Sequence, residues 1–598
     1  MTVTRIFDLL DNFDSYPDTN CSFSDKREGS WVNLSPKEYK KQSLFFASGL
    51  ISFGITKGDK IATVINNCSE WNIIDMGISL VGAVHVPLYP SFSDKEFEYI
   101  LKHSEAKILI IGEYQLFEPL ENIIRNIKQF CDVYSIENIN GAENWKIIID
   151  LGKKSEKLHE QTLKQLKLEI NADDLATIIY TSGTTGISKG VMLSHNNLIS
   201  NALAVASRQH LESGSRILSF LPLCHVYERM VNYQYQFLGI SIIYGEGMNK
   251  IAENLKETRV DGFTAVPRVF EKIYEKILIK GEELHPILRG IFFGALSHAM
   301  KFELGNNSVW FKIVQKFYDI LVYSKWRKAI GGKIRVAGVG GASCRSDLLR
   351  LFWTAKIPVY EGYGLTETSP IITVNYGIPE SGNLFKTLKL GSTGKVLNNV
   401  EVKLSNEGEI LCKGPGVMKG YFKDSIGTDT VFDKEGWFYT GDIGSFDSEG
   451  FLSVTGRKKD LFKTSWGKYV APQHMEDVFR ASLFIDQIIV VGENRNFPSA
   501  IISPDFRHLK QWCRRQNINA LNNNEIIIIN RVIARYRKEI SIINKNFGKA
   551  ERIKGFKLVS DKWSTETGEL SPTQKLKRSY IFEKYHLLVE EIYEQSGK

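Results

Sequence analysis

The stretch that decides the fold reads Tyr180-Thr-Ser-Gly-Thr-Thr-Gly-Ile-Ser-Lys-Gly190. It follows the β-type run Ala176–Tyr180 and precedes Val191-Met-Leu-Ser-His195. Its three glycines permit backbone geometry in which several amide groups turn inward together. Four hydroxyls and the ammonium of Lys189 add donors and a positive charge, so the composition suits a polyphosphate. The loop is not a Walker A motif, because no Gly-Lys pair in this chain is followed by Ser or Thr.

Strands and helices alternate on the N-terminal side of this loop. Helical patterns cover Ser35–Phe53, Glu70–Val81 and Ser93–Ser104, and extended runs lie at Lys60–Ile65, Val84–Leu88 and Ala106–Ile111. This alternation predicts βαβ units and a largely parallel sheet. The same pattern resumes at residue 176 and continues to about residue 365.

The pattern changes twice on the C-terminal side. Short strands with glycine-containing turns occupy residues 386–456, and a mixed α/β segment follows the basic tetrapeptide at 456–459. We therefore predict the α/β class. A large N-terminal domain, residues 1–458, would combine parallel-sheet α/β subdomains with a small β-rich subdomain. A small, mobile α+β C-terminal domain would span residues 459–598. Residues 268–330 form a helical interruption rich in Lys, Phe and Ile.

Composition excludes several classes of protein. The 598 residues are 43% hydrophobic and 24% charged, which is typical of a folded globular chain. The seven cysteines form no CxxC pair, so we expect neither a disulfide framework nor a structural zinc site. The first 25 residues carry acids where a signal peptide needs an apolar core, and no stretch approaches 18 uncharged apolar residues. We expect a cytoplasmic protein with no transmembrane segment.

Charge is distributed unevenly. Residues 451–598 contain 26 Lys and Arg against 16 Asp and Glu, whereas residues 1–450 contain 50 against 52. The basic C-terminal part would suit the phosphates of a small molecule or a membrane surface, but a solvated face explains it equally well. It shows no recognised nucleic-acid motif, and we expect no nucleic-acid partner. The helices at 268–330 are a candidate for peripheral contact with the inner face of a membrane, although their burial in the domain is the favoured interpretation.

Five further motifs follow the phosphate loop in order along the chain. They are Gly340-Gly-Ala342, Glu361-Gly-Tyr-Gly-Leu-Thr-Glu367, Tyr439-Thr-Gly-Asp442, Gly456-Arg-Lys-Lys-Asp460 and Ser571-Pro-Thr-Gln-Lys-Leu-Lys577. With the loop, they resemble the signature motifs of the AMP-forming adenylating superfamily, over roughly residues 30–590. That superfamily includes acyl-CoA synthetases, nonribosomal-peptide adenylation domains and firefly luciferase.

The resemblance implies a set of ATP-binding residues. These are Thr181, Ser182, Gly183, Thr185, Gly186, Lys189, Gly341, Ala342, Glu361, Gly362, Tyr363, Gly364, Thr366, Asp442 and Arg457. Within the set, Tyr363 would stack on adenine, Thr366 would donate to the α-phosphate, and Asp442 would accept hydrogen bonds from the ribose hydroxyls. Gly467 would lie near the path of the coenzyme A thiol.

The resemblance also implies the catalytic residues. A carboxylate must attack the α-phosphorus of ATP, so two anions meet and further negative charge develops. Glu367 and Thr184 would hold magnesium, and Lys575 would contact the carboxylate and the phosphate in the transition state. His225, within Leu221–Arg229, matches the position beside the substrate carboxylate. Lys459 matches the hinge about which the C-terminal domain would rotate between two half-reactions.

Several strings are similar to those of long-chain acyl-CoA synthetases in particular. They are Ala265–Lys272, the helical interruption after it, Gly456–Lys463 and Tyr469–Pro472. The resemblance implies ATP-dependent conversion of a long-chain fatty acid to acyl-CoA through an acyl-adenylate, with ATP, magnesium and coenzyme A as cofactors. Two departures stand out, because Trp466 and Gln574 occupy positions where the pattern usually has glycine.

Two alternatives remain open from the sequence. A fatty acyl-AMP ligase would hand its product to a carrier protein, and dependence on free coenzyme A separates that activity from a CoA ligase. A binding or regulatory protein would keep the fold without catalysis. The presence of Lys189, Glu367, Asp442 and Lys575 argues against such a loss.

Overall fold

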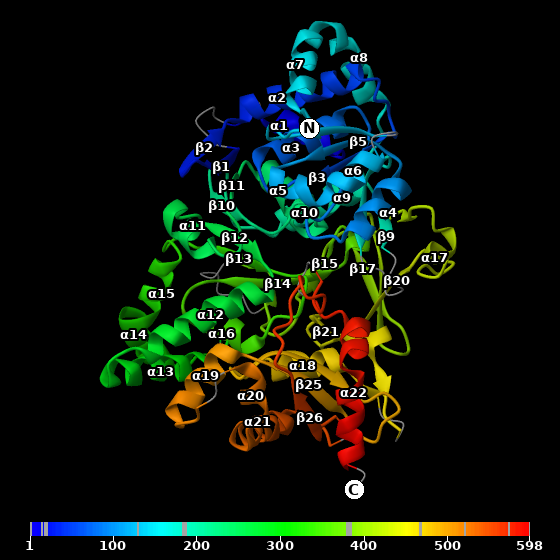
Figure 1. Cartoon of the computed structure of the whole chain (residues 1–598). Helices are drawn as coiled ribbons and strands as arrows, with labels where there is room; N and C mark the ends of the chain where they lie inside the picture. The colour runs from blue at the N-terminus through cyan, green and yellow to red at the C-terminus, as the bar shows by residue number, and fades with distance from the viewer. Residues whose placement is uncertain are drawn as a thin grey trace. The chain divides into compact units, whose positions relative to one another are not determined.

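The computed structural model describes residues 3–13, 16, 22–127, 131–181, 188–305, 307–377, 386–465, 469–519, 522–549, 551–571 and 575–596 (Figure 1). The chain divides into two compact units. The first comprises Met1–Lys403, Leu411–Tyr439 and Asp447–Leu452, and the second comprises Leu404–Ile410, Thr440–Phe446 and Ser453–Lys598. The division at residue 458 stays a prediction from the sequence.

A nine-stranded sheet forms one part of the first unit. Its spatial order is β16 (Lys395–Val396), β15 (Ile371–Val374), β14 (Val359–Gly364), β13 (Val336–Val339), β12 (Gly262–Ala265), β10 (Arg216–Ser219), β11 (Ser241–Tyr244), β1 (Phe23–Arg27) and β2 (Ser30–Leu34). The strands from β14 to β1 pair in parallel, and antiparallel pairs occur only at the two edges. This sheet places the carboxyl ends of β13 and β14 side by side.

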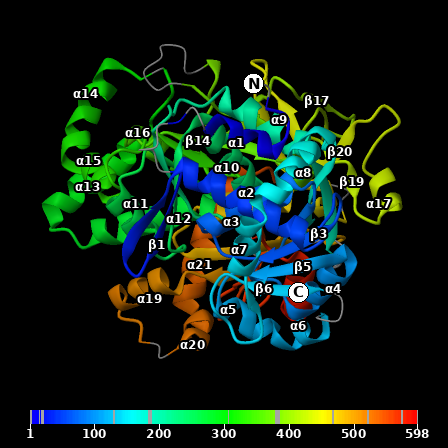
Figure 2. The same ribbon diagram turned by 90° about the horizontal axis from the view of Figure 1, so that it is seen from above.

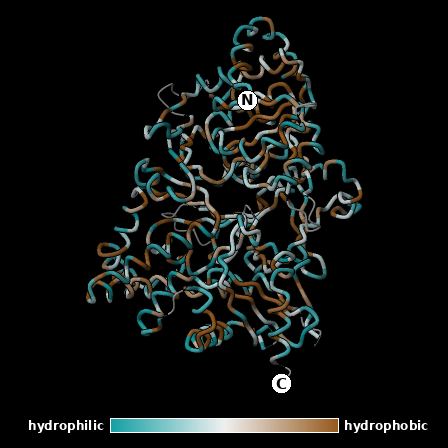
Figure 3. The backbone as a smooth tube through the Cα atoms, viewed as in Figure 1, coloured by the Kyte–Doolittle hydropathy of each residue, from teal (hydrophilic) through white to brown (hydrophobic). Residues whose placement is uncertain are grey.

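An eight-stranded sheet forms the other part. Its spatial order is β19 (Gly420–Tyr421), β9 (Lys189–Ser194), β8 (Leu175–Thr181), β4 (Val84–Pro87), β3 (Lys60–Val64), β5 (Ala106–Ile111), β6 (Asp132–Ser135) and β7 (Glu143–Asn144). From β8 to β7 all pairs are parallel, as the alternation of strands and helices predicted. The tube in Figure 3 is brown along many of these strands, because buried parallel strands are continuously apolar.

Helices connect and cover the strands of the first unit. They are η1 (Ile6–Asp8), α1 (Leu9–Asn12), α2 (Pro36–Ser52), α3 (Ser69–Leu80), α4 (Asp94–Ser104), α5 (Tyr114–Phe117), η3 (Glu118–Leu120), α6 (Glu121–Ile127), α7 (Lys146–Lys154), α8 (Glu156–Glu169), α9 (His195–Ala206), α10 (Val226–Leu238), α11 (Ile251–Thr258), α12 (Pro267–Glu282), α13 (Pro286–Ala299), α14 (Val309–Tyr318), the π-helix η4 (Asp319–Tyr323), α15 (Ser324–Ala329), α16 (Ser346–Thr354), η5 (Thr366–Thr368) and α17 (Ser425–Asp429). Local sequence explains their starts. Ser93 and Glu96 form a capping box at α4, and Ser35 caps α2, whose first residue is Pro36.

A buried charge cluster holds α10 in the first unit. The guanidinium of Arg229 donates to Asp75 and, at 2.7 Å, to the hydroxyl of Thr177 on β8. His85 on β4 and Tyr233 also contact the Asp75 carboxylate. Burial alone would raise the pKa of Asp75, but the charge of Arg229 and the hydrogen bond from His85 outweigh it and hold the pKa at about 2. These contacts tie α10 to α3 and to the interior of the eight-stranded sheet.

A four-stranded sheet has the order β17 (Glu401–Leu404), β18 (Glu409–Lys413), β20 (Phe438–Phe446) and β21 (Leu452–Arg457). This sheet is the small β-rich part that the glycine-containing turns predicted. Elements that lie wholly in the second unit are η7 (Lys458–Asp460), β22 (Phe462–Lys463), β23 (Tyr469–Val470), α18 (Pro472–Phe479), β24 (Ile485–Val491), β25 (Ser499–Pro504), α19 (Phe506–Arg515), α20 (Asn523–Ile528), α21 (Asn530–Ile543), η8 (Asn544–Asn546), β26 (Gly555–Leu558) and α22 (Arg578–Ser596). The predicted α/β class is confirmed.

The helical interruption differs from its favoured interpretation. Helices α13 to α15 lie at the edge of the first unit in Figures 1 and 2. Their inner side is buried, but Trp310, Ile313 and Ile320 are exposed, so the expectation of burial in the domain is wrong for the outer face. None of the helices in the described part of the chain has the length and hydropathy that a membrane span requires.

Candidate active site

The phosphate loop connects the two strands of an antiparallel hairpin. Thr181 ends β8 and pairs with Lys189, which begins β9. The predicted loop residues Ser182, Gly183, Thr184, Thr185 and Gly186 lie outside the described residues. The hairpin brings both flanks of the motif to the same edge of the eight-stranded sheet.

Lys189 and Glu367 meet through Tyr421, which the sequence did not single out. The Lys189 ammonium lies 4.5 Å from the centre of the Tyr421 ring and 3.2 Å from the Asp424 carboxylate. The Tyr421 hydroxyl donates to Glu367 Oε1 at 3.0 Å. The backbone carbonyl of Glu367 also accepts from Met418 N–H at 2.8 Å, just before β19. The cation and the hard oxygen ligand that the sequence predicted are therefore linked by one aromatic side chain.

The two other nucleotide motifs of the first unit lie at neighbouring strand ends. Val339, the last residue of β13, pairs with Glu361 in β14. The carboxylate of Glu361 is buried and accepts from Cys344 N–H at 2.9 Å, which ties the loop after β13 to β14. Because both strands are parallel, Gly341 and Ala342 reach the same edge of the sheet as Gly362. That edge is where ligands bind in open α/β sheets.

Glycine is required at two of these positions. Gly341 has φ +81°, a conformation that L-residues rarely adopt. A Cβ on Gly364 would lie 1.7 Å from the carbonyl oxygen of Pro370, so no side chain fits there. Tyr363 stands between Gly362 and Gly364 in β14 and is partly exposed, as a ring that stacks on a base needs to be. Thr366 follows in η5, directly before Glu367.

His225 caps α10. Its Nδ1 accepts from the backbone N–H of Tyr227 at 3.1 Å, and its ring lies 6.3 Å from that of Tyr89. The imidazole is only partly buried. Because Nδ1 accepts, a neutral His225 carries its proton on Nε2. The helix that begins here forms the wall of a cavity.

The cavity lies between α10 and the strands β13 to β15. Its apolar lining includes Val205, Met230, Val231, Val336, Val339, Ile371 and Val374. Gly338 of β13 and Gly362 of β14 also line the cavity, and Gly362 belongs to the predicted nucleotide motif at residues 361–367. Thr264 also lines the cavity and donates to the buried carboxylate of Glu228, whose pKa burial raises to about 7. An apolar cavity beside a motif that is expected to bind the nucleotide suits a substrate with a hydrocarbon portion.

Asp442 and Arg457 meet in the second unit. Arg457 Nε donates to Asp442 Oδ1 at 2.9 Å, and Asp442 is buried whereas Arg457 is partly exposed. The next residue, Lys458, lies within 3 Å of both Glu407 and Glu409, and these hydrogen bonds raise the pKa of Lys458. The expected ribose residues are thus adjacent, and the lysine that follows Arg457 is held by two acids.

Lys575 lies on a short loop that closes on itself. Its N–H donates to Ser571 Oγ at 3.0 Å, and its carbonyl accepts from Ser571 N–H at 2.8 Å. The backbone N–H of Lys577 donates to the carbonyl of Glu569 at 2.8 Å. The side chain of Lys575 is exposed, and its backbone is held at Ser571.

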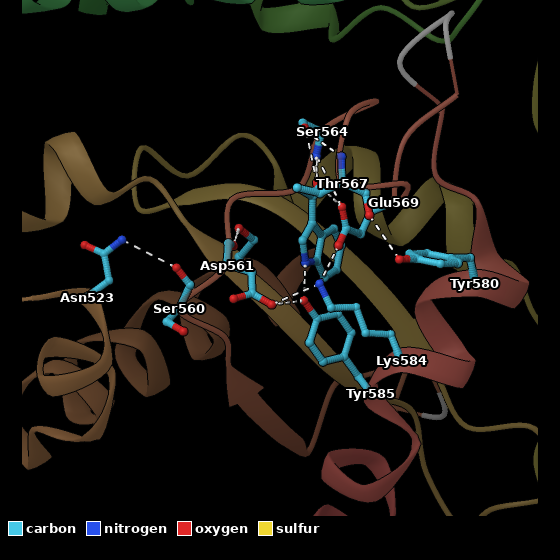
Figure 4. A network of polar contacts seen from close by, with 11 residues as sticks. Asn523, Ser560, Asp561, Ser564, Thr567, Glu569, Tyr580, Lys584 and Tyr585 are labelled. Carbon is cyan, nitrogen blue, oxygen red and sulfur yellow. Dashed lines mark hydrogen bonds and ion pairs between the residues drawn. The ribbon is translucent and has the colours of Figure 1, made fainter. Parts of the chain in front are cut away.

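A polar network at the base of this loop fixes its start (Figure 4). Glu569 is 0% exposed, and its carboxylate lies 2.7 Å from the Lys584 ammonium. Lys584 also lies 3.0 Å from Asp561, which accepts from the Tyr585 hydroxyl at 2.8 Å. Burial alone would raise the pKa of Glu569, but Lys584 and Thr567 outweigh it and hold the pKa below its usual range.

In its described part, the structure places predicted site residues in both units. In the first unit these are Thr181, Lys189, Gly341, Ala342, Glu361–Gly364, Thr366, Glu367 and His225, at sheet edges and at the start of α10. In the second unit they are Asp442 with Arg457, and Lys575 on its own loop. Gly467 and Trp466 lie outside the described residues.

The sequence did not reveal Tyr421, Glu228, Glu569 or Lys584. Tyr421 reaches Glu367 only because β19 pairs antiparallel with β9, with Tyr421 opposite Val191. Glu569 stands six residues before Lys575, and this proximity to a motif is the one available signal. Glu228 carries no signal, because an acid within an amphipathic helix is usually solvated.

These sites define a nucleotide-binding α/β protein, and the comparisons identify its family. Residues 11–422 match the model of the AMP-binding enzyme family, and residues 459–597 match that of the AMP-binding enzyme C-terminal domain. The chain belongs to the AMP-binding enzyme family.

Curated relatives match nearly the whole chain. It is 31% identical over 575 residues to long-chain-fatty-acid–CoA ligase FadD15 of Mycobacterium bovis, covering 95% of this chain and 93% of that protein. It is 29% identical over 605 residues to long-chain-fatty-acid–CoA ligase 1 of Homo sapiens, covering 96% and 84%. Its fold is similar to that of the adenylation domain of a carboxylate reductase from Mycobacterium chelonae, with a TM-score of 0.71 at 18% identity, covering 98% and 91%.

Proposed function

We propose that the protein is an AMP-forming long-chain fatty acid–CoA ligase. It would join a fatty acid to the α-phosphate of ATP, releasing pyrophosphate, and then transfer the acyl group to coenzyme A, releasing AMP. The observation that carries this proposal is the largely apolar cavity whose lining includes Val339, the last residue of β13, and Gly362 of the nucleotide motif in β14. The long-chain substrates named in the two curated relatives support the same reaction.

In the first half-reaction, two anions must approach each other. Lys189 and Lys575 would offset their charge, and the backbone around Gly341 and Gly362 would admit the nucleotide closely. Magnesium bound with ATP would neutralise the phosphates. In the described residues no three His, Cys, Asp or Glu side chains gather into a metal cluster. Glu367 fits the need, because magnesium carried by a nucleotide takes only one or two protein oxygens, and Thr184 would be the second.

In the second half-reaction, the thiol of coenzyme A attacks the acyl-adenylate. We propose that the C-terminal domain, residues 459–598, rotates at Lys459 between the two steps. Lys575 would serve the first conformation and the segment around Gly467 the second. Asp442 and Arg457 would hold the ribose, because a buried carboxylate and a partly exposed guanidinium offer both acceptors and donors. Withdrawal of Lys575 after adenylation would make room for the thiol.

A fatty acyl-AMP ligase that delivers its product to a carrier protein is the alternative activity. One assay separates the two: purified protein is incubated with ATP, magnesium, coenzyme A and fatty acids of graded chain length, and AMP and acyl-CoA are measured by mass spectrometry. We expect acyl-CoA and AMP in equal amounts from long-chain acids. Acyl-AMP without thioester would favour the carrier-dependent activity, and no AMP from any acid would refute the proposal.

The role of Lys575 is tested by dividing the reaction. Lys575→Ala should abolish formation of acyl-AMP and spare thioester formation from supplied acyl-AMP. Lys577→Ala is the matched control, because it removes the same charge two residues away. Loss of both half-reactions in Lys575→Ala, with neither lost in Lys577→Ala, would contradict the division of roles.

We also propose that the enzyme works in the cytoplasm and binds peripherally to the inner face of a membrane. Long-chain fatty acids partition into bilayers, since each buried methylene contributes about 0.8 kcal/mol. The fractionation test is simple: the protein should sediment with membranes at low salt and leave them at high salt. Complete recovery in the supernatant at low salt would contradict this location.

A further inference from the structure

Helix α14 and the π-helix η4 that continues it carry apolar side chains on two opposite sides. On the inner side, Phe311 and Tyr323 are buried. On the outer side, Trp310 and Ile320 are each 73% exposed, Ile313 is 54% exposed and Phe317 is 52% exposed. Their spacing of three and four residues places them in one stripe along the helix. A continuous apolar stripe on a helix is normally covered by a partner, and this one is exposed.

The helix that carries the stripe is held against α13 by two inner contacts. The His298 ring of α13 stacks on Phe311 at 3.9 Å between centres. The Tyr323 hydroxyl donates at 2.7 Å to the carbonyl of Ala295, also on α13. Because these inner contacts hold the helix, the outer side chains cannot turn inward without breaking them. Helices α13 and α14 lie at the outer edge of the first unit in both views (Figures 1 and 2).

The charge around the stripe is predominantly positive. Residues 284–333 contain eight Lys and Arg against two Asp and Glu, a balance of +6, whereas residues 1–450 as a whole carry −2. One of the two acids, Asp319, is already paired with Arg327 and Lys356. Lys312 and Lys316 are exposed beside the stripe, and in the described part of the chain no acid lies within ion-pair distance of either. The segment is therefore a basic island in an otherwise acidic N-terminal region.

We propose that this surface binds an anionic lipid bilayer. The α14 surface is defined as Trp310, Ile313, Phe317 and Ile320 together with Lys312 and Lys316. Its apolar stripe would enter the boundary between headgroups and acyl chains while the lysines remain among anionic headgroups, which is how interfacial helices bind. Trp310 suits that boundary, because tryptophan is enriched there. The ten residues of α14 extend about 15 Å in the plane of the membrane.

A second copy of the chain fits the surface less well. In a two-fold symmetric dimer the same patch faces itself, so Lys312 and Lys316 of both copies would approach one another. An anionic bilayer satisfies the charge and the apolar stripe together. This inference deepens the proposed function, because it rests on that function for its purpose: a ligase acting on long-chain acids would find its substrate in the bilayer.

The test is sedimentation of the full-length protein with vesicles, which requires no turnover. Vesicles of phosphatidylcholine containing 30% phosphatidylglycerol are compared with vesicles of phosphatidylcholine alone. We expect binding to the anionic vesicles that weakens with salt. Ile313→Ser/Phe317→Ser should reduce binding at least tenfold. Lys312→Gln/Lys316→Gln should reduce it roughly 30-fold, and only on anionic vesicles.

The matched control is Leu158→Ser/Leu168→Ser. These leucines of α8 are 74% and 79% exposed, so the control removes equally exposed apolar side chains elsewhere. It should bind as the parent protein does, and thermal unfolding of all variants verifies that they fold. Absence of parent binding to anionic vesicles, or equal loss in the α8 control, would overturn the proposal. So would a concentration-dependent dimer that Ile313→Ser/Phe317→Ser abolishes. Vesicle binding without fatty acid turnover would uphold this surface and refute the ligase function instead.

Discussion

The polar network beneath Lys575 makes the sharpest prediction. Glu569→Gln preserves the shape of the side chain and removes its charge, so Lys584 keeps Asp561 at 3.0 Å as its one acidic partner in the network. Glu569 also accepts from Thr567, and its carbonyl accepts from Lys577 N–H. The substitution therefore acts on the base of the loop that carries Lys575 and leaves Lys575 itself unchanged.

The magnitude follows from the distance and the burial. At 2.7 Å and an effective dielectric constant of about 20, a unit charge pair interacts by about 6 kcal/mol before desolvation is counted. Burying Glu569 offsets part of this, yet its pKa stays below the usual value, so the ionised form is favoured in the fold. Because Asp561 remains to pair with Lys584, we expect a net loss of roughly 2 kcal/mol. The loss should be fully present above about pH 4.5, the value for the unfolded chain, and should shrink as pH falls further through the lowered pKa of Glu569 in the fold.

The assay combines a local and a functional measurement. Hydrogen exchange should show protection of residues 561–577 falling by roughly 30-fold, the equivalent of 2 kcal/mol. Acyl-AMP formation should fall, whereas thioester formation from supplied acyl-AMP should be retained. Glu566→Gln is the matched control, because it removes the same charge at an exposed site three residues away.

Two results would refute this reasoning. Equal exchange protection in Glu569→Gln and Glu566→Gln would mean that the buried charge does not hold the loop. Equal loss of both half-reactions in Glu569→Gln would mean that the substitution disturbs the unit as a whole rather than the position of Lys575.

Three further predictions follow from buried and partnered groups. Tyr421→Phe removes one hydrogen bond to the Glu367 carboxylate while the ring remains beside Lys189, and we expect acyl-AMP formation to slow about tenfold; an unchanged rate across magnesium concentrations would contradict it. Burial lowers the pKa of His195 to about 4, so its stabilising contribution is complete above about pH 6.5 and is lost as pH falls toward 4. Between pH 6.5 and 5, the free energy of unfolding measured in urea should therefore fall by roughly 2 kcal/mol less in His195→Gln than in the parent protein. An equal fall in both proteins would refute this. Burial raises the pKa of Glu228 to about 7, so stability falls as pH rises from about 4.5 through 7. Glu228→Gln should accordingly be more stable than the parent at pH 8.5 by roughly 1–3 kcal/mol, and a less stable variant at that pH would exclude an uncompensated buried charge.

The helical interruption shows how a local pattern can mislead. Its apolar residues are frequent enough to predict burial, and Phe311 and Tyr323 are indeed buried. Trp310 and Ile313 have the same character and face outward. Sequence composition records that a residue is apolar, but the neighbours that cover it belong to other segments. Only the packed structure distinguishes a core-facing stripe from a surface stripe.

The sequence by itself determined the α/β class, the order of elements and the motifs. Each of these depends on neighbours along the chain: the alternation of strand and helix, the capping of α4 by Ser93 and Glu96, and the glycines of the phosphate loop. Local chemistry is sufficient where the controlling contacts span only a few residues.

The tertiary structure decided the partners of those motifs. Tyr421 meets Glu367 across 54 residues of chain, Arg229 meets Asp75 across 154, and both contacts depend on which strands and helices pack together. Lys584 reaches Glu569 only after α22 folds back on the loop. Such contacts are fixed by sheet order and helix packing, which no short stretch of sequence encodes. For this reason the sequence could predict the reacting groups, while only the fold showed which side chains contact them.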